Sequence, residues 1–319
     1  MIRVFLLSLA RAGWAQRVTS GWKFARRAAA RFIAGETAVE ALQIAQQLNS
    51  RSINVTLDHL GENTTTPEGA HQSVLEIVNL YSAIASSGVR ANISIKLSQI
   101  GLMLGEDICK ENLKLILEAA RDHHNFLRID MEDASVTKAT LEVFTWASEQ
   151  NIAPVGIVIQ AYLYRSREDI ERLMKLQGRV RLCKGAYREL AEVAFPKKAD
   201  VDHNFDTLAE LLLHGAQEAG YPTVSEDGRF PPIPAFATHD EKRVNKVIDW
   251  MRQYQFPQRA VEFQMLYGIN RTLQESLVQE GYPVRVYVPY GTHWYPYFMR
   301  RLAERPANLW FFISNYFRH

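Results

Sequence analysis

Eight short runs rich in β-branched residues alternate with helix-like sequence along this chain, and each run ends close to a residue that could take part in chemistry. The runs cover residues 53–58, 91–97, 126–130, 155–160, 180–184, 234–239, 261–266 and 284–290. The residues at their ends are Asp58, Lys96, Asp130, Gln160, Lys184, His239, Gln264 and Tyr287. Strands that alternate with helices form parallel sheets, and eight such units are what a closed (β/α)8 barrel requires. The sequence therefore predicts an α/β fold, a (β/α)8 TIM-type barrel with an N-terminal helical extension, whose active site lies at the C-terminal ends of the strands.

The segments that separate these runs carry helix signals. Helices are expected near residues 37–49, 68–87, 108–122, 135–149, 166–176, 204–219, 241–254, 270–280 and 294–304. Ser166, with Asp169 three residues later, is typical of a helix start, and Gly220 is typical of a helix end. Segment 188–203 is an unusually long connection and is expected to form a loop on the functional face of the barrel.

The length and the charge distribution define two parts of the chain. A barrel of this kind uses roughly 250 residues plus additions, so 319 residues suit a barrel at 37–319 and a basic helical arm at 1–36. Seven Arg and Lys residues in the arm precede the first acidic residue, Glu36. The arm is expected to pack on the barrel with its basic face in water, with contact to anionic lipid or a transit function as alternatives.

Neither a membrane span nor a metal site is expected. The apolar stretch 4–10 is far shorter than the ~20 residues of a membrane helix. Cys109 and Cys183 lack the spacing of a zinc site and are expected to be reduced thiols. The predicted location is the cytoplasm, with peripheral attachment to the inner face of the membrane left open. The net charge of +2 gives no indication of a nucleic-acid partner.

The second predicted strand should carry a buried lysine. Because side chains alternate along a strand, Ser94 and Lys96 face the barrel interior while Ile93 and Ile95 face the helices. An unpaired buried cation is very costly. Asp130, at the end of the adjacent strand, is the expected partner of Lys96.

The last predicted helix carries a cluster suited to binding a small acid. Tyr297, Arg300 and Arg301 are spaced i, i+3 and i+4, so they share one helix face. Two guanidinium groups beside a ring suit a carboxylate with an apolar body, whereas a solvated Arg pair beside a packing tyrosine is the alternative. No Gly-x-Gly-x-x-Gly segment occurs, so a Rossmann site for NAD is not indicated.

Seven segments together resemble one known family. They are Ser94-Ile-Lys96-Leu-Ser98, Ile129-Asp130-Met131-Glu132, Arg181-Leu-Cys-Lys184-Gly185-Ala186-Tyr187, Ala237-Thr238-His239, Glu262-Phe263-Gln264-Met-Leu266, Tyr287-x-Pro-x-Gly-Thr-His293 and Tyr297-x-x-Arg300-Arg301. In this order, over roughly residues 32–310, the chain resembles the flavin-dependent proline dehydrogenases. The likeness is to the short bacterial monofunctional enzymes, because the chain is too short for the aldehyde dehydrogenase module of the fused forms.

The resemblance implies an activity, a cofactor and partners. The activity is FAD-dependent oxidation of L-proline to 1-pyrroline-5-carboxylate, by hydride transfer from proline C5 to flavin N5. This is the first step of proline degradation to glutamate. Electrons would pass to a membrane quinone, and the product to a separate 1-pyrroline-5-carboxylate dehydrogenase.

The resemblance also implies roles for individual residues. Asp130, paired with Lys96 or an arginine, and Arg181, near flavin N5, are the catalytic residues it indicates. The substrate would be bound by Lys96, Tyr187, Leu266, Tyr287, Tyr297, Arg300 and Arg301. The cofactor would be held by Met131, Gln160, Arg181, Lys184, Gly185, Ala186, Thr238, His239, Gln264 and Glu304, and no metal is implied.

One departure and two other interpretations stay open. Many larger family members carry tryptophan after the residue that matches Tyr187, whereas this chain has Arg188, which leaves the adenine end of the cofactor site undefined. A Schiff-base aldolase is one alternative, because lysines such as Lys96 and Lys184 form imines when their pKa is lowered. A barrel that serves as a non-catalytic scaffold is the other.

Overall fold

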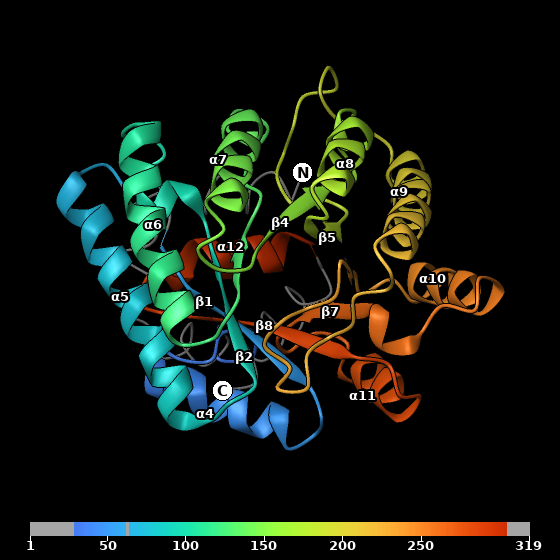
Figure 1. The fold of residues 1–319 in the computed structure, drawn as a ribbon, viewed down its shortest axis with the longest axis horizontal. Helices are drawn as coiled ribbons and strands as arrows, with labels where there is room; N and C mark the ends of the chain where they lie inside the picture. Colours follow the sequence, from blue (N-terminus) through green and yellow to red (C-terminus); the bar gives the residue numbers. More distant parts are fainter. Residues whose placement is uncertain (1–28, 62–63, 305–319) are drawn as a thin grey trace, which may run out of the picture.

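Parallel strands close into a barrel at the centre of the molecule (Figure 1). The structure is a computed structural model that describes residues 29–61 and 64–304. Its eight strands follow the chain order around the barrel, and β1 pairs with both β2 and β8. The strands are β1 (Asn54–His59), β2 (Ala91–Ile95), β3 (Leu127–Ile129), β4 (Val155–Gln160), β5 (Arg179–Cys183), β6 (Pro234–Ala237), β7 (Glu262–Leu266) and β8 (Val284–Tyr290). The predicted (β/α)8 architecture is confirmed.

A layer of helices surrounds the strands. In Figure 1, α5 and α6 lie on one side of the barrel, and α9, α10 and α11 lie on the opposite side. The described helices are α4 (Ala38–Asn49), α5 (Pro67–Ser87), α6 (Glu106–Asp122), α7 (Thr137–Gln150), α8 (Ser166–Lys175), α9 (Lys198–Glu218), α10 (Glu241–Gln253), α11 (Arg271–Gln279) and α12 (Trp294–Glu304), with short 3₁₀ turns at Leu97–Ile100 and Gln258–Ala260. Helix α4 precedes the barrel, α5 to α11 connect successive strands, and α12 follows β8.

The ends of α5 show how local sequence sets these boundaries. The Thr66 side chain accepts a hydrogen bond from the Gly69 N–H, which satisfies one of the free donors of the first turn. Pro67 occupies the first turn, where its missing N–H is not needed. Gly88 ends the helix in the left-handed conformation at φ +67°, which glycine adopts without strain.

One predicted helix start was wrong, one expected helix cap does not form, and one predicted end is confirmed. Helix α9 begins at Lys198 rather than 204, because Asp202 pairs with Lys198 one turn earlier and with Lys184 on the neighbouring loop. Ser166 does not cap α8, since its hydroxyl donates to the Gln160 carbonyl at the end of β4 instead. Gly220 follows α9 in the left-handed conformation, as predicted.

The outward faces of the strands form the hydrophobic core against the helices. Ile93 and Ile95 of β2 and Val286 and Val288 of β8 are fully buried there. The inward faces are mostly polar, in contrast to the branched aliphatic layers that usually fill such barrels. Below the functional end, buried Arg128 fits only because β4 carries a glycine. A Cβ on Gly156 would lie 2.5 Å from the Arg128 guanidinium.

The described end of the N-terminal arm packs on the barrel. Phe32 and Ile33 are buried, and the Ala34 N–H donates to the Pro289 carbonyl at 2.9 Å. The Phe32 ring lies 6.4 Å from that of Phe298 on α12. The rest of the predicted arm, residues 1–28, lies outside the described residues. None of the helices in the described part is long and apolar enough to cross a membrane.

Candidate active site

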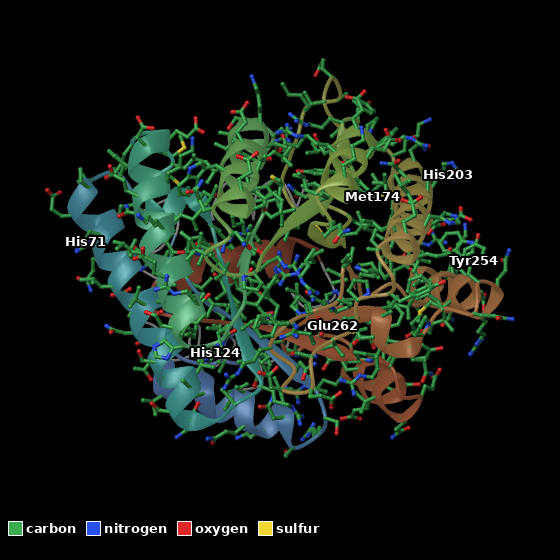
Figure 2. All side chains as sticks on the ribbon, in the orientation of Figure 1. His71, His124, Met174, His203, Tyr254 and Glu262 are labelled. Carbon is green, nitrogen blue, oxygen red and sulfur yellow. The ribbon has the colours of Figure 1, made fainter. Side chains whose placement is uncertain are left out.

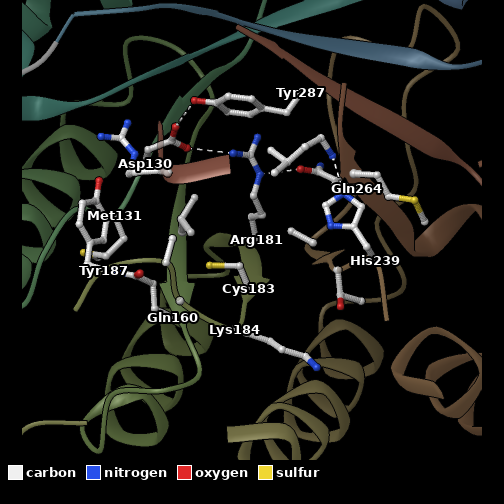
Figure 3. A pocket seen from close by; sticks show the side chains of 18 of the residues that line it. Asp130, Met131, Gln160, Arg181, Cys183, Lys184, Tyr187, His239, Gln264 and Tyr287 are labelled. Atoms are coloured by element: carbon white, nitrogen blue, oxygen red, sulfur yellow. Dashed lines mark hydrogen bonds and ion pairs between the residues drawn. The ribbon is translucent and has the colours of Figure 1, made fainter. Parts of the chain in front are cut away.

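A cavity of about 610 Å³ opens at the C-terminal ends of the strands (Figure 3). Helix α12 forms one wall of this cavity, and the ends of β2 to β8 and the segments that follow them form the rest. The structure brings together all but one of the predicted site residues here: Lys96, Asp130, Met131, Gln160, Arg181, Lys184, Gly185, Ala186, Tyr187, Thr238, His239, Gln264, Leu266, Tyr287, Tyr297, Arg300 and Arg301. The exception is Glu304, whose side chain lies outside the described residues.

Positive charge dominates the wall of the cavity. Its cationic side chains are Lys96, Arg181, Lys184, Lys198, Arg300 and Arg301, whereas its carboxylates are Asp130 and Asp240. Apolar walls of low dielectric strengthen the field of such an imbalance. The cavity therefore suits a ligand that carries negative charge.

Arg181 lies at the centre of the site, between side chains from two other strands. Its Nη1 donates to the Asp130 carboxylate at 2.9 Å, and its Nε donates to the Gln264 amide oxygen at 2.5 Å. Figure 3 shows the guanidinium between these two groups. The guanidinium also lies 5.4 Å from the centre of the Tyr287 ring, within cation–π range. Three contacts thus fix the position of this charge.

Asp130 collects hydrogen bonds from three strands. Besides Arg181, its carboxylate accepts from the Ser94 hydroxyl at 2.6 Å and from the Tyr287 hydroxyl at 2.7 Å. Burial raises the pKa of Tyr287 well above its usual value, and the charge of Asp130 raises it further. The phenol therefore stays protonated and holds its ring in a fixed orientation at the cavity wall.

The expected pairing of Lys96 with Asp130 was wrong, because the ion-pair partner of Lys96 is Asp58, at 3.2 Å. Strand β2 lies between β1 and β3, so both aspartates were within reach, and alternation alone could not choose between them. Burial raises the pKa of Asp58 even though the charge of Lys96 opposes this shift. The family-based alternative, in which an arginine pairs with Asp130, agrees with the Arg181 contact.

Helix α12 contributes the arginine pair. Tyr297, Arg300 and Arg301 line the same cavity, which agrees with the helix face predicted from their spacing. The Arg301 guanidinium lies 5.1 Å from the centre of the Tyr297 ring, and both residues are buried. The interpretation as a solvated surface pair is therefore wrong for Arg301, whereas Arg300 lines the cavity and is partly exposed. Two guanidinium groups and a ring face the interior, as a small carboxylate with an apolar body requires.

Lys184 lies at the rim between two carboxylates. Its Nζ is 2.5 Å from Asp202 of α9 and 2.6 Å from Asp240, which precedes α10. Partial burial raises the pKa of both aspartates, but the hydrogen bonds and positive charges of Lys184 and Lys198 together outweigh it, so each pKa lies below the usual value. The pairing joins β5, α9 and α10 next to the cavity.

The loop after β5 and the end of β6 shape the rest of the wall. Gly185 has φ +113°, and a Cβ there would lie 2.3 Å from the Tyr162 ring, so the loop needs glycine. His239 Nε2 accepts a hydrogen bond from the Leu266 N–H at 2.9 Å, which leaves Nδ1 as the protonated nitrogen of the neutral ring. The Gln160 amide donates to the Glu132 carbonyl at 2.7 Å.

Sequence reasoning assigned no binding or catalytic role to several residues that line the cavity or contact its lining residues. Asp58 ends a predicted strand and was a candidate by position alone. Asp240 directly follows His239, and Cys183 directly precedes Lys184, so both were adjacent to predicted residues. Asp202 had no local signal, because it reaches Lys184 only through the fold. Over the described residues, no cluster of possible metal ligands occurs, and both cysteines are free thiols, as expected.

A (β/α)8 barrel with a cationic cavity at its strand ends, closed by a helix that carries an arginine pair, defines a barrel enzyme for a small carboxylate substrate. The family model of proline dehydrogenase matches residues 41–313. The chain belongs to the proline dehydrogenase family, flavoenzymes that catalyse the first step of proline catabolism, and is of the monofunctional bacterial type.

The relatives support this placement over nearly the whole chain. Proline dehydrogenase 2 of Bacillus subtilis is 38% identical over 97% of this chain and 96% of its own length. Proline dehydrogenase of Deinococcus radiodurans is 39% identical over 90% of this chain and 89% of its own. A crystal structure of proline utilization A from Bdellovibrio bacteriovorus, inactivated by N-propargylglycine, is 28% identical with a TM-score of 0.79. It covers 88% of this chain but only 33% of the larger protein.

Proposed function

We propose that this protein binds FAD in the cavity and oxidises L-proline to 1-pyrroline-5-carboxylate, with a quinone as the final electron acceptor. Family membership supports proline as the substrate. The single observation that carries the proposal is the convergence of Lys96, Arg300 and Arg301 on one cavity beside the fixed guanidinium of Arg181.

The residues present fit the cofactor. Gly185 lines the cavity without a side chain, so its backbone can approach a ligand closely next to the amine of Lys184. Lys184, with backbone groups of Gly185 and Ala186, suits a diphosphate. Gln160, Thr238, His239 and Gln264, with the backbone of Met131, suit the ring system and its ribityl chain. When bound, the flavin supplies a hydride acceptor at N5.

The substrate site is the part of the cavity beneath α12. Arg300, Arg301 and Lys96 bind the proline carboxylate through charge-assisted hydrogen bonds. Tyr187, Leu266, Tyr287 and Tyr297 enclose the pyrrolidine ring and exclude water from it. Orientation of the C5 hydrogen by a fixed clamp is worth several kcal/mol of the barrier, because the reacting atoms no longer have to meet by chance.

Arg181 contributes a fixed positive charge at the centre of the site. A bound flavin that accepts two electrons from the amine would gain negative charge beside this residue. A cation that is already oriented by Asp130 and Gln264 stabilises this charge without reorganisation. This role assigns Arg181 and Asp130 as catalytic residues.

The Schiff-base alternative is disfavoured by the ion pairs. An imine-forming lysine must lose its proton, but Lys96 lies against Asp58, and Lys184 lies between Asp202 and Asp240. Opposite charges at these distances favour the protonated, non-nucleophilic amine. Neither lysine is prepared for nucleophilic attack.

One absorbance experiment tests the proposal. The purified protein should carry the visible bands of an oxidised flavin, and anaerobic addition of L-proline should bleach them. A colourless preparation that does not take up FAD would contradict the proposal. Covalent trapping of a carbonyl substrate on lysine by borohydride would favour the aldolase, and the absence of both signals would favour a non-catalytic scaffold.

The electron acceptor and the product are tested separately. A soluble quinone analogue should restore the oxidised flavin spectrum after reduction by proline. The product should react with o-aminobenzaldehyde, and a separate 1-pyrroline-5-carboxylate dehydrogenase should convert it further. Failure of the quinone to reoxidise the enzyme would remove this part of the proposal alone.

A further inference from the structure

A buried ion pair lies inside the barrel, beneath the active site. Glu262 of β7 and Arg285 of β8 are 0% and 1% exposed. The guanidinium binds both carboxylate oxygens, through Nε at 2.8 Å and through Nη2 at 3.0 Å. It also donates to the carbonyl oxygens of Val55 at 2.8 Å and Gly228 at 2.6 Å. Figure 2 shows Glu262 at the centre of the molecule, far from labelled surface residues such as His71.

This pair determines which way the amide of Gln264 points. The Gln264 nitrogen donates to Glu262 at 2.6 Å, and its oxygen accepts from the Arg181 Nε at 2.5 Å. An ionised carboxylate accepts hydrogen bonds and cannot donate, so it requires the nitrogen end of the amide. With the nitrogen so placed, the oxygen faces Arg181. A flipped amide would set an N–H group against the N–H of Arg181 and leave both buried donors unsatisfied.

The chain of contacts continues to the cavity. Arg181 donates to Asp130, whose carboxylate also accepts from the hydroxyl of Tyr287. Each link is a directed hydrogen bond between buried or partly buried groups. Two hydrogen bonds through Gln264 therefore connect the carboxylate of Glu262 to a guanidinium on the wall of the cavity, although Glu262 itself does not line it.

We propose that Glu262 and Arg285 are positioning residues for proline oxidation: through the amide of Gln264 they hold the Arg181 guanidinium in its catalytic orientation. This inference rests on the proposed function of the cavity. A positioning role differs from a purely structural one. The effect of an ion pair that only supported the fold would not pass through Gln264.

The direction in which the reduction potential of the bound flavin changes distinguishes a direct charge effect from a loss of the Arg181 orientation. Removing a buried negative charge stabilises a nearby reduced, anionic cofactor and raises the potential. Loss of the orientation of Arg181 withdraws positive charge from the same place and lowers the potential. For Glu262→Gln we expect a lower potential, a kcat reduced by about tenfold and a proline KM changed by less than roughly twofold, since the lost contact acts mainly in the transition state.

A double-mutant cycle tests the path through Gln264. Gln264→Leu should lower the potential and kcat in the same way, and adding Glu262→Gln to it should lower neither further, because the relay is already broken. In the double variant the lost charge of Glu262 should act alone and raise the potential. Thr56→Val is the matched control: its hydroxyl makes a buried hydrogen bond to Asn92 at 2.6 Å inside the same barrel. It should reduce stability but leave the potential and the kinetics unchanged.

A second variant keeps the test decisive if Glu262→Gln does not fold. Arg285→Lys retains both charges but loses the two-pronged contact with Glu262, so it should lower the potential and kcat in the same direction by a smaller factor. A raised or unchanged potential in the single variants, or additive losses in the double variant, would overturn the inference. Wild-type protein without flavin or proline bleaching would instead contradict the proposed function.

Discussion

Arg300 and Arg301 give the most direct residue-scale prediction. Replacing either with methionine should raise the proline KM by at least about tenfold, because a charge-assisted bond to the carboxylate is lost in both ground and transition states. Steady-state kinetics with L-proline measures this change. Arg167→Met is the matched control, since Arg167 is exposed on α8 and pairs with Glu171 one helical turn later. An unchanged KM in both variants would remove the carboxylate clamp from the proposed mechanism.

Lys96 and Asp58 form a second residue-scale test. Lys96→Met leaves the buried Asp58 carboxylate without the cation beside it, and removal of one partner of a buried pair costs about 3–5 kcal/mol. The free energy of unfolding, measured with denaturant, should fall by this amount. Adding Asp58→Asn should recover most of the loss without recovering proline affinity. Full stability in the single variant would show that another group compensates for the charge.

For single residues, the sequence predicts the strand face on which a side chain lies better than it predicts the ion-pair partner of that side chain. Alternation placed Ser94 and Lys96 correctly toward the barrel interior. The same rule could not decide whether Asp58 or Asp130 would bind the lysine, because two neighbouring strands each offer an aspartate. Which aspartate pairs with Lys96 depends on the distances between side chains inside the closed barrel, and a local sequence pattern does not contain these distances.

The contacts of Lys184, which connect β5, α9 and α10, predict that the free energy of unfolding depends on pH. The pKa of Asp202 and that of Asp240 both lie below the usual 3.8, so their contribution to stability is present above that pH. It is lost as pH falls through the lower, folded-state values. The stability difference between wild type and Asp202→Asn/Asp240→Asn should therefore shrink as pH falls from about 5 to about 2.

Acid titration of the unfolding free energy is the measurement. Glu171→Gln serves as the control, because the Arg167–Glu171 pair is exposed and should contribute little at any pH. A stability difference that is constant across the titration would show that the two aspartates do not act through their charge.

The conformation of Gly185, in the loop after β5, predicts how a single added methyl group would change stability and flavin binding. Ala at this position meets the Tyr162 ring and a strained backbone at φ +113°, so Gly185→Ala should cost about 3 kcal/mol or more and weaken flavin retention. Gly88→Ala at the end of α5 has open space around it and should cost only about 1 kcal/mol, from backbone strain. Denaturant unfolding and the ratio of flavin to protein measure both effects. Equal losses in the two variants would exclude a specific role for the loop.

The positions of helices and strands were predictable where the local sequence pattern agreed with the packing of the folded barrel. The strands fall within one or two residues of their predicted positions, because β-branched runs coincide with buried walls. The early start of α9 was not predictable, since it depends on the contact of Asp202 with Lys184 from another loop. Ser166 carries a capping signal, but the free Gln160 carbonyl at the end of β4 binds its hydroxyl instead.

For the whole molecule, the number of strand–helix units determines the architecture. Eight units close the sheet, closure brings all strand ends to one side, and residues spread from Lys96 to Arg301 then share one cavity. The polar barrel interior was harder to predict. Gly156 makes room for Arg128, and the Glu262–Arg285 pair reaches Arg181 through Gln264. These contacts connect residues from five strands.

Cofactor binding should stabilise the whole barrel, because the cavity walls come from its separate strands. At a free FAD concentration of 100 times its Kd, the gain is about 2.7 kcal/mol, or roughly 5 °C in Tm for a domain of this size. Thermal unfolding of the protein with and without added FAD measures the shift. Riboflavin, which lacks the diphosphate, is the matched control and should give a smaller one. Equal shifts would show that Lys184 and its loop do not recognise the diphosphate.

The two cysteines of the chain differ sharply in accessibility. Cys109 is fully buried behind β2, and burial raises the pKa of its thiol to about 12, so it is protected from alkylation in the folded protein. Cys183 lies on the cavity wall. An environment-sensitive dye attached at this one position would report occupancy of the pocket by fluorescence, without any engineered substitution.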